Sequence, residues 1–448
     1  MIELILSLFI IGFAMYLIKK RYDIKIVMLS SGIMLMLSAC CLNKPILSEE
    51  MSCGIPFFDI FKVIGNLFTK QLSGASFTLL LLFGYTAYMK AIGANEKTVS
   101  LLANPLKHIR YKGLLIPIFY WIGNLLCLII PSSSSLSVML MATAFPILTR
   151  AGMSPLSVGA IIATSATIAP TPLGADNLLA SEALGMSVTD YVFKYHAKIS
   201  IPIIIIMAFV HLVWQKRQDR LSPQPLVIEV EEKSSPLEVP HYYAILPMLP
   251  LGLMMMFYFK SDVNLGISEV TFLSLLISIC CEVFRFRSVK KATDQLQIFF
   301  NGMGTGLTTV VVQVVAALTF VEGLKILGII DFIGEWIQHL EAAGVLLTII
   351  FCVVALGVGL LSGSGLAIFY ALVELMPSFA NNVGISPIFL AIPMQFVSHL
   401  VKSISPVSPT VLIISSMMNV CVMQLIKRTI VPVVVGMILS LILTYVIL

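Results

Sequence analysis

Runs of apolar residues, mostly about 16 to 22 residues long, alternate with short polar segments along the whole chain. A helix of about 20 apolar residues is long enough to cross the hydrocarbon layer of a membrane. Because lipid offers no hydrogen-bond partners, spanning segments must be helices or closed barrels, and the alternation of barrel strands is absent. We therefore predict membrane helices over 2–18, 24–42, 73–93, 113–131, 136–150, 154–195, 197–215, 242–259, 269–284, 302–322, 344–361, 366–380, 386–426 and 429–448.

Composition supports this interpretation. Of the 448 residues, 58% are hydrophobic and 11% are charged, whereas soluble domains have about 25% charged residues. So few charges cannot cover a water-exposed surface, which excludes disorder and nucleic-acid binding. The eight cysteines show no zinc spacing, and we predict no metal site and no cofactor. The chain is expected to be an all-α polytopic membrane protein in a lipid bilayer.

Basic residues indicate the orientation of these helices. They cluster at 19–21, 97–112, 216–220, 285–291 and 427–428. Cytoplasmic loops of membrane proteins carry an excess of Lys and Arg. Placing these clusters inside, together with Lys25, Lys90, Arg150 and Lys233, assigns 20 of the 28 basic residues to the cytoplasm, 7 to the outside and Lys402 to a span. This orientation places both termini outside.

The same orientation requires two segments to enter and leave the membrane on one side. Residues 113–150 begin and end near cytoplasmic charges, and residues 344–380 begin and end outside. We predict a re-entrant hairpin for each, with one tip at Pro131–Ser135 and the other at Ser362–Gly365.

The two halves of the chain have similar patterns. In residues 1–215 and 242–448 alike, five spans are predicted, and the hairpin is followed by a long apolar segment that prolines interrupt. Because the halves start on opposite sides, they form inverted repeats. A polar segment over 216–241 is predicted to be a cytoplasmic linker. The interrupted segments are 154–195 and 386–426, and the amphipathic stretches before the hairpins are 94–112 and 323–341.

Interrupted helices at matching places in inverted halves indicate the binding site of a secondary carrier. A helix break leaves free N–H groups that attract anions, whereas free carbonyl and hydroxyl groups can hold a cation. We predict that two hairpin tips and two helix breaks form a substrate site near the middle of the membrane.

Polar residues at these four places are the candidate ligands. The predicted substrate contacts are Ser132, Ser133, Ser134, Ser135, Thr171, Ser362, Gly363, Ser364, Gly365, Lys402, Ser403, Ser405 and Ser408. The candidates for a coupling ion, either Na⁺ or H⁺, are Asp176, Ser135 and Ser364.

The same residues could have structural roles instead of binding a ligand. The tip serines can cap their own helix, and Asp176 can cap a half-helix that starts near Asn177. Lys402 can pair with Glu374 or extend to water instead of binding an anion. His399, one turn before Lys402, is either a site residue or a structural hydrogen-bond donor.

Short motifs follow one another in order along nearly the whole chain. Among them are Leu140–Thr143 before Phe145 and Pro146, Tyr243–Pro247, Ser362–Gly365 before Phe369–Ala371, and Ser405–Ser408. Together they resemble the Dcu-C-type carriers, the anaerobic four-carbon dicarboxylate transporters of bacteria.

The resemblance implies exchange, uptake or efflux of succinate, fumarate or malate across the bacterial inner membrane. We predict no enzymatic activity, because Ser76, in the one serine motif of interest, lies at the start of a span and no H-E-x-x-H metal motif occurs. It also implies the architecture of the wider ion transporter superfamily, with a scaffold, an elevator-like transport domain and a homodimer.

The chain departs from the family pattern at three places. Leu366 stands where the second tip of the family has an amide, and the first break, 169–176, is longer. Val401–Ser403, which contain Lys402, stand where the family pattern has Gly-Arg-Thr. Lysine keeps the positive charge but lacks the two-pronged geometry of arginine. Carriers of another small anion or of an amino acid, and cation/proton antiporters, are the alternative functions.

Overall fold

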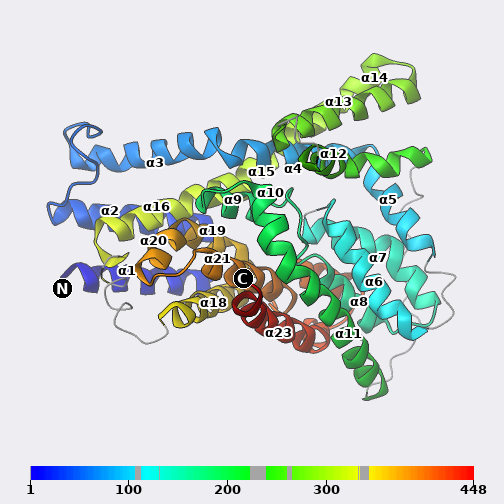
Figure 1. Cartoon of the computed structure of the whole chain (residues 1–448). Helices are drawn as coiled ribbons and strands as arrows, with labels where there is room; N and C mark the ends of the chain where they lie inside the picture. The colour runs from blue at the N-terminus through cyan, green and yellow to red at the C-terminus, as the bar shows by residue number, and fades with distance from the viewer. Residues whose placement is uncertain are drawn as a thin grey trace.

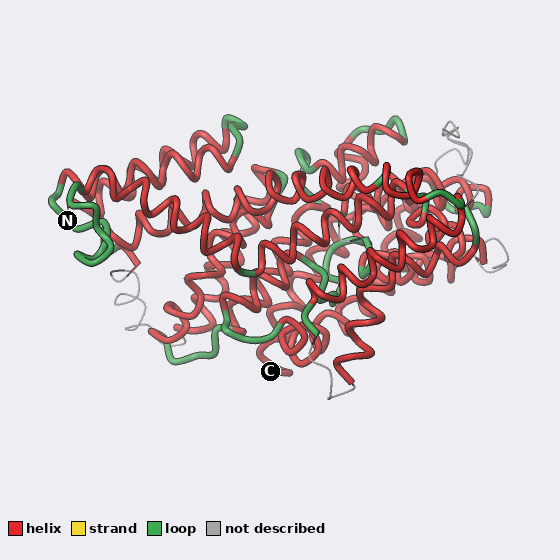
Figure 2. Tube along the Cα trace, turned by 90° about the horizontal axis from the view of Figure 1, so that it is seen from above, coloured by secondary structure: helices red, strands yellow, loops and turns green. Residues whose placement is uncertain are grey.

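The computed structural model describes the chain except residues 1, 106–111, 131, 222–238, 260–264, 331 and 333–342. Helices make up nearly all of the described residues, and no strand occurs among them (Figure 2). Seven helices in this part are long and apolar enough to cross a membrane, or eight if the bent pair α3–α4 counts as one span. These features confirm the prediction of an all-α polytopic membrane protein.

The first half of the chain contains the elements shown in blue to green in Figure 1. They are α1 (Ile2–Lys19), α2 (Ile24–Cys41), α3 (Pro56–Ser73), α4 (Ala75–Ala91), α5 (Ala94–Ala103), α6 (Lys112–Cys127), α7 (Ser133–Arg150), α8 (Pro155–Ser165), α9 (Ala175–Ala183), α10 (Val188–Asp190), the π-helix η2 (Tyr191–His196) and α11 (Ala197–Leu221).

The second half begins after the segment that is not described. It contains η3 (His241–Met248), α12 (Leu249–Phe259), α13 (Ile267–Phe286), α14 (Val289–Asp294), α15 (Leu296–Gly306), the π-helix η4 (Leu307–Val311), α16 (Val312–Ile326), α18 (Ala343–Ser362), α19 (Gly365–Leu372), η5 (Val373–Leu375), α20 (Met376–Asn382), α21 (Ile388–Leu400), η6 (Val401–Ser403), α22 (Pro409–Met417) and α23 (Val422–Ile447).

Helix α3 lies where the apolar pattern predicts no span. Its start is stabilised by Asp59, which accepts hydrogen bonds from the Ser52 hydroxyl at 2.5 Å and the Cys53 N–H at 2.7 Å. Its buried apolar residues, Ile60 and Val63, lie one turn apart on one face, so no continuous apolar run marks the helix. Helix α3 continues into α4 with a bend of 58°.

The predicted span 302–322 is the inner part of a much longer helix. Residues 289–326 form a 38-residue helical segment, which at 1.5 Å per residue is about 57 Å long. This exceeds the thickness of the hydrocarbon layer, about 30 Å.

Glycines allow the long helices to pack closely. A Cβ atom added at Gly302 of α15 would lie 2.6 Å from the Ala87 Cβ of α4, and one added at Gly84 would lie 2.8 Å from the Phe299 carbonyl oxygen. Gly32 of α2 makes the same kind of close approach to the α16 backbone at Thr319. Small residues at helix contacts allow the backbones to approach within a membrane.

An ion pair between a buried arginine and a half-buried aspartate connects a second group of helices, α8, α11 and α23. Arg428, which is 3% exposed, lies 2.5 Å from Asp219 and also donates to Ser157. Gln215 of α11 donates to the Arg428 carbonyl oxygen at 2.9 Å. A paired and hydrogen-bonded charge is tolerated inside a protein, whereas removal of one partner is costly.

Two predicted segments lie largely outside the described residues. Helix α11 extends to Leu221, so the predicted linker over 216–241 starts within a helix, and residues 222–238 are not described. Helix α5 covers the first part of the basic stretch 94–112. Most of the acidic stretch 323–341 is also outside the described residues.

The close packing of α15 on α4 leads to a stability prediction. We expect Gly302→Ala to lower the thermal midpoint of the detergent-purified protein, because overpacking costs about 1–3 kcal/mol. Gly304→Ala, two residues away with nothing within 4 Å of the added Cβ, serves as the control. Alanine forms helices better than glycine, so this control should not lose stability. Equal midpoints for the two variants would refute the packing role of Gly302.

Candidate functional site

Two helix breaks and two helix-to-helix turns surround one cavity of about 580 Å³. The breaks separate α8 from α9 and η6 from α22, and the turns join α6 to α7 and α18 to α19. The opposite wall comes from α4 and from the α15–η4–α16 helix, through residues such as Phe83, Thr305 and Gln313. The cavity therefore lies between the long helices and the four interruptions.

The starts of four helices line this cavity. Ser133 begins α7, Ala175 begins α9 and Pro409 begins α22, and all three residues lie on the cavity wall. Gly363 and Ser364, directly before α19, lie there too. Free N–H groups and the positive end of the helix dipole make each such start favourable for an anion.

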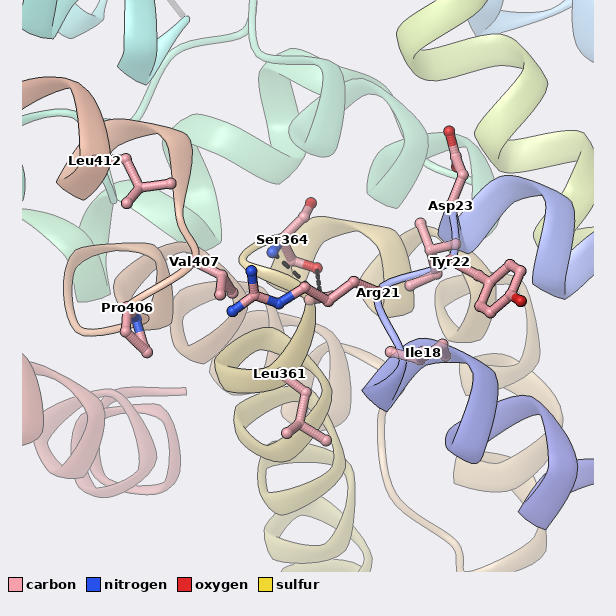
Figure 3. A pocket seen from close by; sticks show the side chains of 11 residues that line it. Ile18, Arg21, Tyr22, Asp23, Leu361, Ser364, Pro406, Val407 and Leu412 are labelled. Atoms are coloured by element: carbon pink, nitrogen blue, oxygen red, sulfur yellow. Dashed lines mark hydrogen bonds between the residues drawn. The ribbon is translucent and has the colours of Figure 1, made fainter.

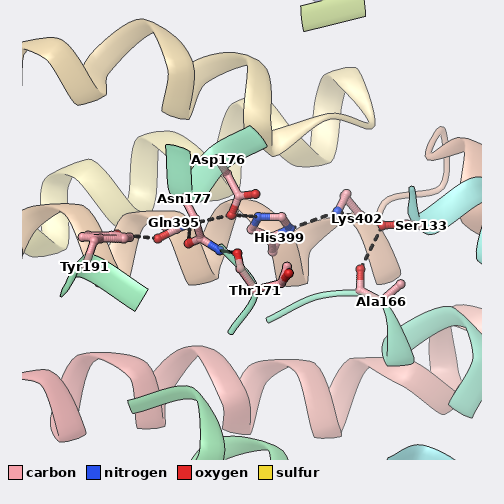
Figure 4. Close-up of polar contacts among 9 residues, drawn as sticks. All are labelled: Ser133, Ala166, Thr171, Asp176, Asn177, Tyr191, Gln395, His399 and Lys402. Carbon is pink, nitrogen blue, oxygen red and sulfur yellow. Dashed lines mark hydrogen bonds and ion pairs between the residues drawn. The ribbon is translucent and has the colours of Figure 1, made fainter. Parts of the chain in front are cut away.

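A chain of polar side chains runs along the cavity wall that the helix breaks form (Figure 4). The Lys402 ammonium lies 3.0 Å from the Ser133 hydroxyl and 3.1 Å from Nδ1 of His399. Nε2 of His399 lies 2.7 Å from a carboxylate oxygen of Asp176. The Ser133 hydroxyl donates to the Ala166 carbonyl oxygen at 2.8 Å. Two oppositely charged groups are thus connected through one imidazole ring.

A second set of hydrogen bonds holds Asp176 in place. Gln395 donates from one amide nitrogen to Asp176 at 2.5 Å and to Asn177 at 2.7 Å. The Tyr191 hydroxyl donates to the amide oxygen of Gln395, and Asn177 donates to the Thr171 carbonyl oxygen. The side chain of Asp176 is only 12% exposed, so its carboxylate is fixed rather than mobile.

Most of the residues singled out from the sequence meet at this cavity. Those on its wall are Asp176, Ser132, Ser133, Ser134, Ser135, Gly363, Ser364, Lys402 and Ser408. Ser132 also accepts a hydrogen bond from the Ser135 N–H and caps α7. The buried hydroxyl of Ser408 has no partner among the described atoms.

The other singled-out residues lie behind the wall. Thr171, Ser403 and Ser405 each donate to a backbone carbonyl oxygen, of Leu128, Ala163 and Leu360 respectively. Ser362 donates to the Val358 carbonyl oxygen. At Gly365, an added Cβ would meet the backbone of Ser398 at 2.4 Å. These contacts hold the breaks and the second tip in shape.

Comparison with known proteins identifies the family. The model of the C4-dicarboxylate anaerobic carrier family matches residues 1–448. The chain belongs to this family. Members of the family are transporters and not enzymes.

Two relatives illustrate the similarity of the carrier to known transporters. An anaerobic C4-dicarboxylate transporter DcuC of Escherichia coli K12 is 32% identical over 99% of this chain and 96% of its own length. A probable anaerobic C4-dicarboxylate transporter DcuC of Vibrio cholerae is 31% identical over 98% of this chain and 96% of its own.

Two solved structures share the fold of the carrier at low identity. The MtrF protein of Neisseria gonorrhoeae, described with a class of antimetabolite efflux pumps, has a TM-score of 0.61 at 14% identity and covers 94% of both chains. The YdaH transporter of Alcanivorax borkumensis has a TM-score of 0.62 at 16% identity, over 94% of this chain and 97% of its own.

Several cavity residues of the carrier were not predicted from the sequence. Lys90 of α4 and Asn95 of α5 line the cavity, but Lys90 served only as a marker of the cytoplasmic side. Gln395, which contacts Asp176, lies four residues before His399 on α21 and therefore on the same helix face. The spacing of four residues from His399 is the sequence feature that could have identified Gln395 as a site residue.

The position of Lys402 also settles its polar partners in the carrier. Its ammonium contacts Ser133 and His399, and Glu374 lies 3.9 Å from Lys70 instead. The predicted alternative of a Lys402–Glu374 pair is therefore wrong.

A second cavity, of about 500 Å³, lies on another side of the second hairpin tip (Figure 3). Arg21, from the turn between α1 and α2, extends toward Ser364 and Val407 there. Ser364 lines both cavities. The tip of the second hairpin is therefore a thin partition between two cavities of the carrier.

The partition depends on a tight contact at Gly363. This residue has φ of +76°, and an added Cβ would lie 2.7 Å from the Val407 carbonyl oxygen. Gly384 has a similar φ of +69° but nothing within 4 Å. Alanine in this left-handed region costs about 1–2 kcal/mol at either position.

We therefore expect Gly363→Ala to lower the thermal midpoint of the purified carrier further than Gly384→Ala does, because only the first also displaces the Val407 backbone. Differential scanning fluorimetry in detergent measures both. An equal loss in the two variants would mean that the tip does not need this contact.

Proposed function

We propose that the chain is a secondary active transporter of C4-dicarboxylates such as succinate, fumarate and malate in the bacterial inner membrane, working by exchange or by ion-coupled symport or efflux. Family membership over the whole chain and the names of the two relatives support the substrate class. The observation that carries the proposal is the cavity lined by four helix starts and Lys402.

The chemistry of the cavity suits a small dianion. A cation such as Lys402 can bind one carboxylate, while the N–H groups at the four helix starts bind either. Lys90 on the opposite wall, from α4, is available for the second carboxylate. A volume of about 580 Å³ accommodates a four-carbon diacid together with water. The serines and threonines on the wall supply further hydrogen bonds.

Inverted repeats are part of this proposal. The order of a long helix, a hairpin, an interrupted helix and a long final helix occurs once as α3–α4, α6–α7, α8–α9 and α11. It occurs again as α14–α16, α18–α19, α21–α22 and α23. Figure 1 has α6 and α7 toward one end of the molecule and α18 and α20 toward the other. Approach from opposite ends is what inverted repeats require.

An elevator movement is proposed for the same reason. The glycine contacts between α2 and α16 and between α4 and α15 make these long helices a candidate scaffold. The Arg428–Asp219 pair connects helices of the hairpin-bearing part, the candidate transport domain. Because the cavity lies between the two parts, sliding of one against the other would carry the substrate. A homodimer formed through the scaffold, with both termini outside, completes the proposal.

The direct test is transport by the purified protein in liposomes. We expect counterflow of labelled succinate, fumarate or malate against the same unlabelled diacids. Lys402→Ala should reduce kcat/KM about 10- to 150-fold, because hydrogen bonds to charged groups contribute about 1.5–3 kcal/mol. Lys402→Arg keeps the charge and should retain most of the activity.

Lys325→Ala is the matched control, since Lys325 is exposed at the end of α16 and outside the cavity. Counterflow should be unaffected by this change. The proposed function fails if the wild-type protein moves no dicarboxylate under any proton, sodium or counter-substrate gradient. Transport that survives Lys402→Ala unchanged would indicate another substrate site.

Ser133 gives a finer test of how Lys402 is positioned. Ser133→Ala removes one of the two contacts of the ammonium and should lower kcat/KM roughly fivefold, the equivalent of about 1 kcal/mol. Ser137→Ala is the control, because its buried hydroxyl lies one turn further along α7, outside the cavity, and has no partner among the described atoms. Equal uptake kinetics in the two variants would contradict a positioning role for Ser133.

A further inference from the structure

We propose that His399 binds the coupling proton on Nδ1, and that the substrate triggers this binding by drawing the Lys402 ammonium away from the imidazole. The inference rests on the proposed function, since it assumes that an anion enters the cavity. It assigns the coupling site to an imidazole rather than to a sodium site at Asp176.

The hydrogen-bond geometry determines the state of His399 without substrate. A lysine ammonium has only donors, so Nδ1 of His399 must accept the hydrogen bond from Lys402 across 3.1 Å. The ring proton is then on Nε2, which donates to Asp176 across 2.7 Å. The imidazole is neutral in this state, and the Lys402⁺–His399–Asp176⁻ chain has no net charge.

A dianion would disturb this balance. A carboxylate that binds Lys402 competes with Nδ1 for the ammonium, and Nδ1 is then left as a buried acceptor without a donor. At the same time, two negative charges enter a site that already contains the Asp176 carboxylate. An imidazolium stabilises such an arrangement, because an opposite charge nearby favours the protonated form of histidine. The proton comes from bulk water and adds to Nδ1, and it leaves again when the substrate leaves.

The surroundings of His399 favour it over other groups as the proton acceptor. The further titratable groups around this chain are Tyr191 and His196 from η2, Tyr370 from α19 and Cys127 from α6. Tyrosines and thiols are ordinarily neutral at pH 7. His196 is the remaining imidazole, and its ring lies edge-on against Phe396, 4.6 Å between centroids, rather than beside Lys402.

One carboxylate oxygen of Asp176, Oδ2, is already occupied by N–H donors and is therefore a poor ligand for sodium. A hard cation such as sodium needs oxygen ligands, but one carboxylate oxygen of Asp176 faces two N–H donors, Gln395 Nε2 and His399 Nε2. Both side chains are held by a second hydrogen bond, which the Gln395 amide oxygen accepts from Tyr191 and His399 Nδ1 accepts from Lys402. A cation at this oxygen would have to displace them.

The test measures protons carried per substrate. Wild-type protein in liposomes with a trapped pH indicator is given fumarate, with potassium and valinomycin to clamp the voltage. We expect net fumarate entry to acidify the lumen by about one proton per fumarate, as a single imidazole site requires, with or without sodium.

His399→Gln separates the proton from the hydrogen bonds. A glutamine amide can donate to Asp176 and accept from Lys402 but cannot be protonated at neutral pH. We expect slower but measurable fumarate entry, with the ratio of protons to fumarate falling to zero. His196→Gln is the control, and its ratio should equal that of the wild-type protein.

The outcomes distinguish the two levels of the proposal. Absence of fumarate transport by the wild-type protein overturns the proposed function itself. Fumarate transport that depends on sodium and moves no protons overturns the inference alone, as does a proton ratio that survives His399→Gln or is lost in His196→Gln.

A measurement without any mutation covers the case in which His399→Gln does not fold. Calorimetric titration of fumarate into the wild-type protein, in two buffers of different ionisation enthalpy near pH 7.5, counts the protons taken up on binding. Uptake of about one proton supports the inference, because neutral imidazole predominates before binding. No uptake refutes it.

Discussion

Backbone groups freed inside a membrane must find partners within the protein, since lipid offers none. In this chain, four interruptions of helical structure share that requirement, and one cavity receives all of them. Some freed groups are satisfied locally, as at Ser132, which caps α7, and Thr171, which binds the Leu128 carbonyl oxygen. The remaining helix starts face the cavity. The need to satisfy these backbone groups thus produces an environment favourable to an anion.

The two charged side chains at the site also have partners within the protein. Lys402 and Asp176 lie in a largely buried region, where unpaired ions are unfavourable. His399 connects them, and Gln395, Asn177 and Tyr191 hold the acidic end. The cationic end, Lys402, and the acidic end, Asp176, both lie on the cavity wall, and Gln395 holds the second. An anion can engage the first while the second remains anchored.

Close helix contacts lie on more than one side of this site. Gly302 and Gly84 bring α15 and α4 into close contact, whereas Arg428 and Asp219 connect α23 to α11 on the other part of the molecule. One wall of the cavity comes from α4 and the α15–η4–α16 helix, and the other comes from the helix breaks and turns. A substrate bound there would contact both walls. The thin partition at Ser364 marks one place where access to the cavity could be controlled.

Much of the site could be predicted from the sequence, because its markers are local. Serine runs, proline pairs and lone charges such as Lys402 and Asp176 stand out against apolar segments. Helix α3 was missed because its apolar residues occupy one face only. Gln395 was missed because its partner Asp176 lies 219 residues away; its spacing from His399 puts it on the same helix face but does not reveal that partner. Thr171 and Ser403 look like ligands in the sequence, but their hydroxyl groups donate hydrogen bonds to backbone carbonyl oxygens.

A structure of the protein with fumarate bound, determined by cryo-electron microscopy, tests the central claim most directly. The account predicts density for the diacid in the cavity of about 580 Å³, with one carboxylate within hydrogen-bonding distance of the Lys402 ammonium and of the helix starts at Ser133 or Ser408. Density only in the second cavity beside Arg21, with Lys402 still bound to His399, would contradict it.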